Sequence, residues 1–111
     1  MTLGRPGTRS SLRQQTGIAA LDHEIAQEQA SALGRLGRAL DTALAALAEY
    51  DRTEPERGAA RSALVQQASN ALWCFIVQRE SIGLRDPRPV IRDYRVPAEV
   101  QNRMGVFGGR R

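Results

Sequence analysis

The feature that most constrains the fold is a run of helix-forming residues without proline from Gly17 to Tyr50. Its large apolar residues recur at steps of mostly three and four, which places them along one side of an α-helix. These residues are Ile18, Leu21, Ile25, Ala32, Leu33, Leu36, Leu40, Leu44 and Leu47. We predict one helix over about residues 17–50, and Thr16 is a suitable N-cap. A helix this long favours a partner helix over an isolated position on a surface.

A second helix is predicted from residue 54 to residue 82. Thr53 and Glu56 have the spacing of a capping box, and Pro55 is tolerated only in a first helical turn. Gly83 followed by Leu84 is typical of a Schellman stop, and two prolines downstream enforce the end. Because the connection is short, we expect the two helices to form an antiparallel hairpin.

The remaining segments are shorter. Residues 97–104 fit a short third helix, opened by Pro97 and followed by Gly105. Residues 1–16 are expected to form a disordered basic arm, the helical domain covers 17–105, and 106–111 form a flexible tail. The fold class is therefore all-α, since only 5% of residues are aromatic and β-branched runs are missing.

The hairpin leaves apolar residues exposed on a second side. Trp73, Val65 and Val77 widen the apolar stripe of the second helix beyond what one partner helix covers. Either the C-terminal segment folds back over that side, or two chains pair into a four-helix bundle. We expect the second arrangement, a homodimer.

Facing positions in the hairpin can be estimated by centring the turn near residue 52. Gly34 and Gly37 then lie opposite Asn70 and Gln67, where small residues allow close packing or mark a bend. The same register brings Arg79 near Glu24 and Glu28, and we expect an interhelical ion pair there. A solvated Arg79 at the edge of the stripe is the alternative.

Charge and composition limit the classes of function. The chain of 111 residues has 16 basic side chains, all of them Arg, against 12 acidic ones, which gives a net charge of +4. Arginine alone fits phosphate binding or simply the codon usage of a GC-rich genome. No apolar run approaches the length of a membrane span or of a signal peptide, and one Cys excludes an internal disulfide. We therefore expect a cytoplasmic protein without a membrane partner.

No constellation of residues points to catalysis. A metal site needs three or four ligands, whereas His23 and Cys74 are the only His and Cys, and the predicted register keeps them apart. No glycine-rich phosphate loop follows a strand. We expect no enzyme activity, no metal and no cofactor.

Nucleic-acid binding is the alternative function. Residues 90–105 faintly resemble the second half of a helix-turn-helix, but Arg95 occupies the position in the turn that glycine usually takes. The Arg-rich ends, with +3 over residues 1–16 and +4 over residues 85–111, would also attract phosphates.

Several motifs resemble those of one family. They are ALDHEIAQE at 20–28, ALGR at 32–35, WCFIVQRE at 73–80, GLRD at 83–86 and DYRVPAEV at 93–100. Together they resemble a family of small bacterial proteins known only as a domain of unknown function, which implies a compact helical protein and no known activity. We predict a protein-interaction or adaptor module with an unknown protein partner. The candidate interaction residues are His23, Glu28, Trp73 and Arg79.

Overall fold

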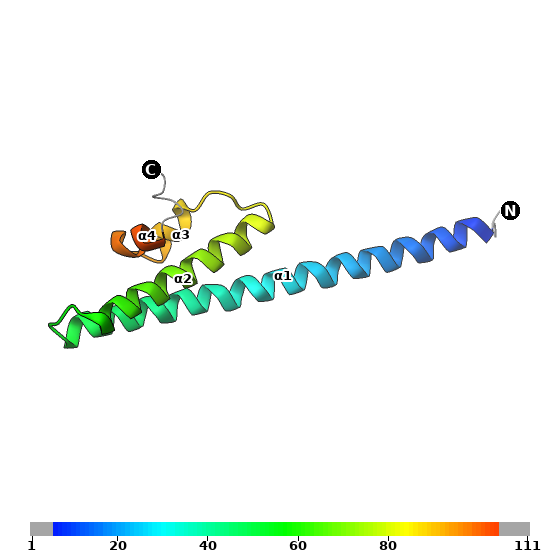
Figure 1. Cartoon of the computed structure of the whole chain (residues 1–111). Helices are drawn as coiled ribbons and strands as arrows, with labels where there is room; N and C mark the ends of the chain where they lie inside the picture. Colours follow the sequence, from blue (N-terminus) through cyan, green and yellow to red (C-terminus); the bar gives the residue numbers. More distant parts are fainter. Residues whose placement is uncertain (1–5, 105–111) are drawn as a thin grey trace. The chain divides into compact units, whose positions relative to one another are not determined.

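The computed structural model describes residues 6–104, with side chains from Thr16 onward. This part of the chain contains helices and no strands, as predicted: α1 (Pro6–Thr53), α2 (Ala59–Ser81), α3 (Arg88–Asp93) and α4 (Ala98–Met104) (Figure 1). The chain divides between Ser31 and Ala32 into two compact units, and α1 contributes to both.

In the first unit, the described residues belong to α1 alone. The helix begins at Pro6, not near Gly17 as expected, and it includes most of the residues predicted to form a disordered arm. A proline at the start of a helix lacks only an N–H that would have no partner there. Residues 1–5 of the predicted arm, and residues 105–111 with the predicted tail, lie outside the described residues.

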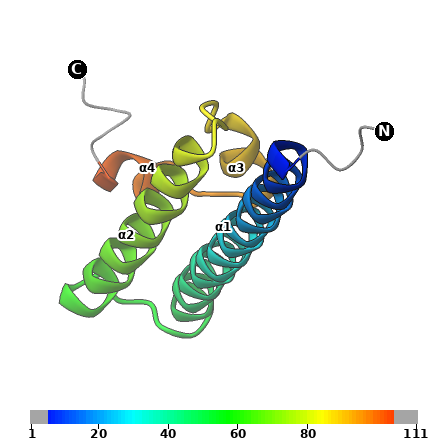
Figure 2. The same ribbon diagram turned by 90° about the vertical axis from the view of Figure 1, so that its right-hand side faces the viewer.

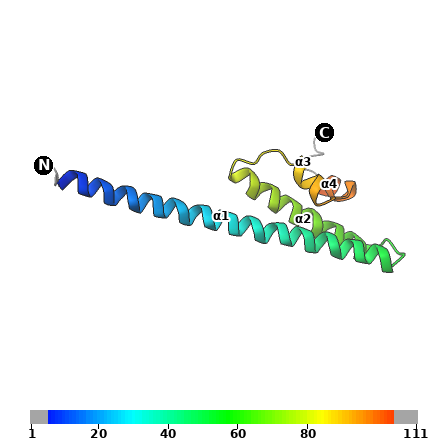
Figure 3. The same ribbon diagram turned by 180° about the vertical axis from the view of Figure 1, so that it is seen from behind.

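The second unit is built on the predicted antiparallel hairpin. From Ala32 onward α1 runs to Thr53, the chain turns over residues 54–58, and α2 runs back beside it (Figures 1 and 3). Leu40 and Leu47 of α1 pack against α2 residues such as Leu72, which buries one side of each helix. The hairpin follows from the 3.6-residue periodicity of both segments.

The connection differs from the predicted capping box. Thr53 ends α1, and its hydroxyl donates to the Glu49 carbonyl at 2.9 Å, so it does not cap α2. The N-cap of α2 is Gly58 instead, and α2 begins at Ala59, later than the expected residue 54. The turn is thus longer than predicted, and this changes which residues of the two helices face each other.

The end of α2 agrees with the prediction. Gly83 has φ +96°, its N–H donates to the Glu80 carbonyl at 3.0 Å, and the Leu84 N–H donates to the Arg79 carbonyl at 2.9 Å. These two bonds form the Schellman motif expected from the sequence. They stop α2 and direct the chain toward α3.

Two short helices cover the hairpin. Pro87 is the N-cap of α3 and Pro89 lies in its first turn, where proline is tolerated, so the prolines that end α2 also begin the next helix. The sequence did not predict α3, whereas it did predict α4, which packs directly against α2 (Figure 2).

One apolar core joins the four helices of the described chain within the second unit. It comprises Leu40, Leu47, Val65, Ala68, Leu72, Phe75, Ile76, Val90, Val96 and Val100. The last three come from the C-terminal segment, which therefore folds back over the hairpin. That was the first of the two arrangements that the exposed apolar side allowed, and it leaves the outer side of α2 uncovered.

Candidate interaction surfaces

The four residues predicted to form interaction sites lie in different units. His23 and Glu28 are exposed on the part of α1 that belongs to the first unit, while Trp73 and Arg79 lie on α2 in the second. The first unit also exposes a short apolar stripe, in which Ile18 is 59%, Leu21 56% and Ile25 48% exposed. The surfaces described below all belong to the second unit.

Arg79 supports the connection after α2. Its guanidinium donates to the Asp86 carbonyl at 3.2 Å and lies 6.0 Å from the centre of the Phe75 ring. These contacts hold the chain where it leaves α2 for α3. The ion pair expected with Glu24 or Glu28 would join the two units, and it stays a prediction.

The predicted register of the hairpin is wrong at Gly37. A Cβ added there would lie 2.7 Å from the Tyr94 hydroxyl and 3.5 Å from the Phe75 ring, so Gly37 faces these two rings and not Gln67. The longer connection after Thr53 explains the shift. The absence of a side chain at Gly37 admits Tyr94, whose ring meets Phe75 edge-on at 5.5 Å between centroids.

The outer face of α2 has no charged residue of its own, although Arg103 of α4 borders it and donates to the Gln66 side chain at 3.4 Å. We give this name to its exposed residues Ala63, Gln66, Gln67, Asn70, Trp73, Cys74 and Val77. Their spacing of three and four residues places them on one side of the helix. Trp73 is 42% and Val77 40% exposed, and the whole segment 62–78 contains no charged residue.

Arg61 ties three helices together, although its side chain is almost fully buried. Its guanidinium makes a bidentate pair with Asp51 at the end of α1, at 2.6 and 3.0 Å. It makes a second bidentate pair with Glu99 in the first turn of α4, at 2.8 and 2.7 Å. We call this arrangement the Arg61 cluster.

The electrostatics of the Arg61 cluster favour its charged state. The hydrogen bonds from Arg61 lower the pKa of Asp51 and the pKa of Glu99. The two carboxylates in turn raise the pKa of Arg61. Because four of the five guanidinium N–H donors bond to the two carboxylates, we assign the cluster a structural role.

Sequence reasoning missed the Arg61 cluster, but a signal for it was present. Residues 61, 65, 68 and 72 fall on one helical stripe, and the last three are the apolar core residues Val65, Ala68 and Leu72. A charged residue on such a stripe must find partners when it is buried. The identity of those partners, 10 and 38 residues away, depends on the fold.

A groove lies between α1 and the turn after α3. It has a volume of about 410 Å³, and we call it the Arg95 groove. Its lining residues are Leu33, Gly34, Gly37, Arg38, Asp41, Asp93, Tyr94 and Arg95. A neighbouring hollow of about 360 Å³ shares Asp41, Tyr94 and Arg95 with it and extends to the Arg61 cluster.

Residues 6–104 contain no cluster of metal ligands and no helix that could span a membrane. No group of three or more His, Cys, Asp or Glu side chains in this range could hold a metal ion. None of the helices described is both long enough and apolar enough to span a membrane.

Comparison with known proteins yields one match. The model of a family described as a family of unknown function (DUF6665) matches residues 8–111. This range contains every motif on which the resemblance noted in the sequence rests. No curated protein and no solved structure matches the chain.

Proposed function

The chain belongs to this family of unknown function, and we propose that it is a protein-interaction module without catalytic activity that works as a homodimer. The observation that carries the proposal is the outer face of α2, which exposes Trp73 and Val77 within a segment that has no charge.

The lack of charge on this face is the first argument for an interface. Charged residues make up 25% of the chain, yet none occurs in residues 62–78. The cores of protein interfaces are depleted of charged side chains and enriched in aromatic ones.

The same face suits a second copy of the chain. In a twofold symmetric dimer each face meets itself, so a charged face would bring like charges together. The residues of this face are uncharged, and Arg103, which borders it, is held by Ser62 and Gln66. From Ala63 to Val77 the face extends about 21 Å at a rise of about 1.5 Å per residue. Two hairpins paired along it would form a four-helix bundle, with Trp73 as the main aromatic anchor.

The contacts of α4 favour this proposal over the nucleic-acid alternative. A recognition helix reads bases with residues near its N-terminus. In α4, Glu99 of the first turn is held by Arg61, and the carbonyl of the buried Val100 accepts a hydrogen bond from Ser69 at 2.9 Å. These contacts turn the start of α4 toward α2.

Size-exclusion chromatography with light scattering over a wide concentration range tests the proposal. We expect the wild type to reach twice its chain mass of 12.2 kDa. The double variant Trp73→Gln/Val77→Gln keeps the face neutral and should remain a monomer with unchanged helicity. The matched control, Ala46→Gln at an exposed position of α1, should still dimerise.

A wild type that is monomeric at every concentration would overturn the proposal, and so would a double variant that dimerises like the wild type. The absorbance ratio at 260 and 280 nm tests the alternative in the same run. A nucleic-acid-like ratio that is lost at high salt would favour nucleic-acid binding, because phosphate contacts weaken steeply with ionic strength.

A further inference from the structure

Arg95 has a backbone conformation that normally belongs to glycine. Its φ is +54°, in the left-handed region, where a side chain is strained. The Arg95 N–H donates to the Arg92 carbonyl at 3.2 Å and the Val96 N–H to the Ile91 carbonyl at 3.0 Å, which is the Schellman pattern again. At the equivalent end of α2 the chain has Gly83.

The position of Arg95 gives a reason why an arginine, and not a glycine, occupies this left-handed backbone position. Arg95 lines the Arg95 groove together with Arg38, whose guanidinium lies beside Gly34. Neither of these two makes an ion pair within the described chain, whereas Arg52, Arg88 and Arg92 on the surface each pair with a neighbouring carboxylate. Asp93, which also lines the groove, is the partner of Arg92.

The rest of the groove has the character of a binding site. Gly34 and Gly37 contribute no side chains, so the surface of α1 is hollowed beneath Tyr94. The Tyr94 hydroxyl has no hydrogen-bond partner in residues 6–104 and can donate to a ligand. The volume of about 410 Å³ falls within the range of about 300–1,000 Å³ usual for small-molecule sites.

We infer that the Arg95 groove binds a small anion through a phosphate or carboxylate group. The guanidinium groups of Arg38 and Arg95 would grip the anion, since their planar donor pairs match the oxygens of either group. The Tyr94 hydroxyl would add a third donor. This site shares no residue with the outer face of α2, so it is independent of the proposed dimer.

Asp41 distinguishes an anionic ligand of the groove from a cationic one. Asp41 lines the same groove, and its carboxylate makes no ion pair in the described residues. A bound anion is repelled by this charge, so Asp41→Asn should strengthen anion binding. A ligand that binds through a cationic group would respond in the opposite way.

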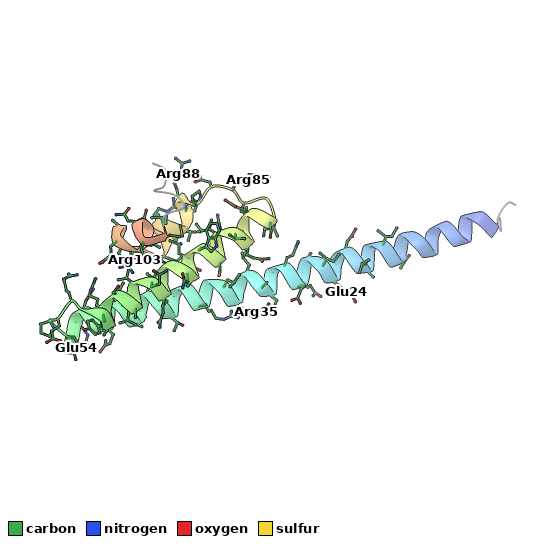
Figure 4. The ribbon with its side chains drawn as sticks, in the orientation of Figure 1. Glu24, Arg35, Glu54, Arg85, Arg88 and Arg103 are labelled. Atoms are coloured by element: carbon green, nitrogen blue, oxygen red, sulfur yellow. The ribbon has the colours of Figure 1, made fainter. Side chains whose placement is uncertain are left out.

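Isothermal titration of the full chain with inorganic phosphate, pyrophosphate and citrate, at constant ionic strength, tests the inference. We expect binding by the wild type, and a loss of about tenfold to a hundredfold in affinity for Arg95→Gly and for Arg38→Gln. Arg85→Gln makes the same change of charge on the α2–α3 connection, outside the groove, and should bind like the wild type (Figure 4). Preference for phosphate or for citrate distinguishes the two anion classes.

Arg95→Gly also separates binding from folding. Glycine removes the strain of the left-handed backbone, so the melting temperature without anion should rise while the affinity falls. Three outcomes would overturn the inference: no binding of any of the three anions, equal binding by wild type and Arg95→Gly, or weaker binding by Asp41→Asn.

Discussion

Two glycines one turn apart in α1 have different surroundings. A Cβ at Gly34 would meet only the guanidinium end of Arg38, at 3.3 Å, and this flexible group can move. A Cβ at Gly37 would collide with the Tyr94 hydroxyl at 2.7 Å, on a ring that Phe75 holds in place. Gly37 is therefore required by packing, and Gly34 is not.

The corresponding alanine variants should change stability in opposite directions. Gly34→Ala gains helix propensity, so the free energy of unfolding should rise by up to about 1 kcal/mol. Gly37→Ala should lower it by about 1–3 kcal/mol, because the methyl group overpacks the site. Urea unfolding followed by circular dichroism measures both, and a Gly37→Ala variant as stable as Gly34→Ala would contradict the packing argument.

At the scale of the elements, periodicity predicted α1, α2 and α4 but not α3. Pro87 and Pro89 were interpreted only as a stop for α2, although a proline at a helix start serves both purposes. Trp73 could be predicted from the sequence as an interaction residue, because it widens the apolar stripe of the second helix. The Arg95 groove could not be predicted, since residues 33–41 and 93–95 meet only after α3 and its turn have positioned Tyr94.

One buried hydroxyl adds to the attachment of α4, beside the Arg61 cluster and the burial of Val100. Ser69, which is 1% exposed, donates to the carbonyl of the fully buried Val100. Ser69→Ala would remove this hydrogen bond and leave the carbonyl only its helical bond within α4, so it should destabilise the protein by about 0.5–1.5 kcal/mol. Because α4 has seven residues and is too short to be stable alone, hydrogen exchange should accelerate most in residues 98–104.

Ser81→Ala is the matched control for this variant. The Ser81 hydroxyl donates to the Gln78 carbonyl at 2.6 Å at the exposed end of α2, so its loss should leave exchange in α4 unchanged. If Ser69→Ala accelerates exchange equally throughout α2 and α4, the two helices open as one unit and the hydroxyl does not hold α4 separately.

At the scale of the whole second unit, the Arg61 cluster links the end of α1, the start of α2 and the start of α4. The pKa values of Asp51 and Glu99 lie below their ordinary values of 3.8 and 4.5. The folded state therefore binds protons less readily than the unfolded chain. This contribution to stability is fully present above the ordinary values and is lost as the pH falls through the lowered ones.

We expect the melting temperature of the wild type to fall as the pH is lowered below about 4.5, the ordinary pKa of Glu99. Arg61→Met should melt at a lower temperature at neutral pH, because two carboxylates lose their partner, and should show a flatter acid profile. Arg52→Met, which removes only an exposed pair with Glu49, should follow the wild type. Parallel acid profiles for wild type and Arg61→Met would show that the cluster does not govern acid stability.

The burial of Val90, Val96 and Val100 in the core of the hairpin has a consequence for biosynthesis. A ribosome adds roughly 5–20 residues per second from the N-terminus, so Leu72 and Ile76 emerge before the segment that covers them exists. A nascent chain that stops short of Val96 has a complete hairpin sequence and an open core. Chaperones and proteases recognise such exposed apolar surface. We therefore expect a prematurely terminated chain to be degraded.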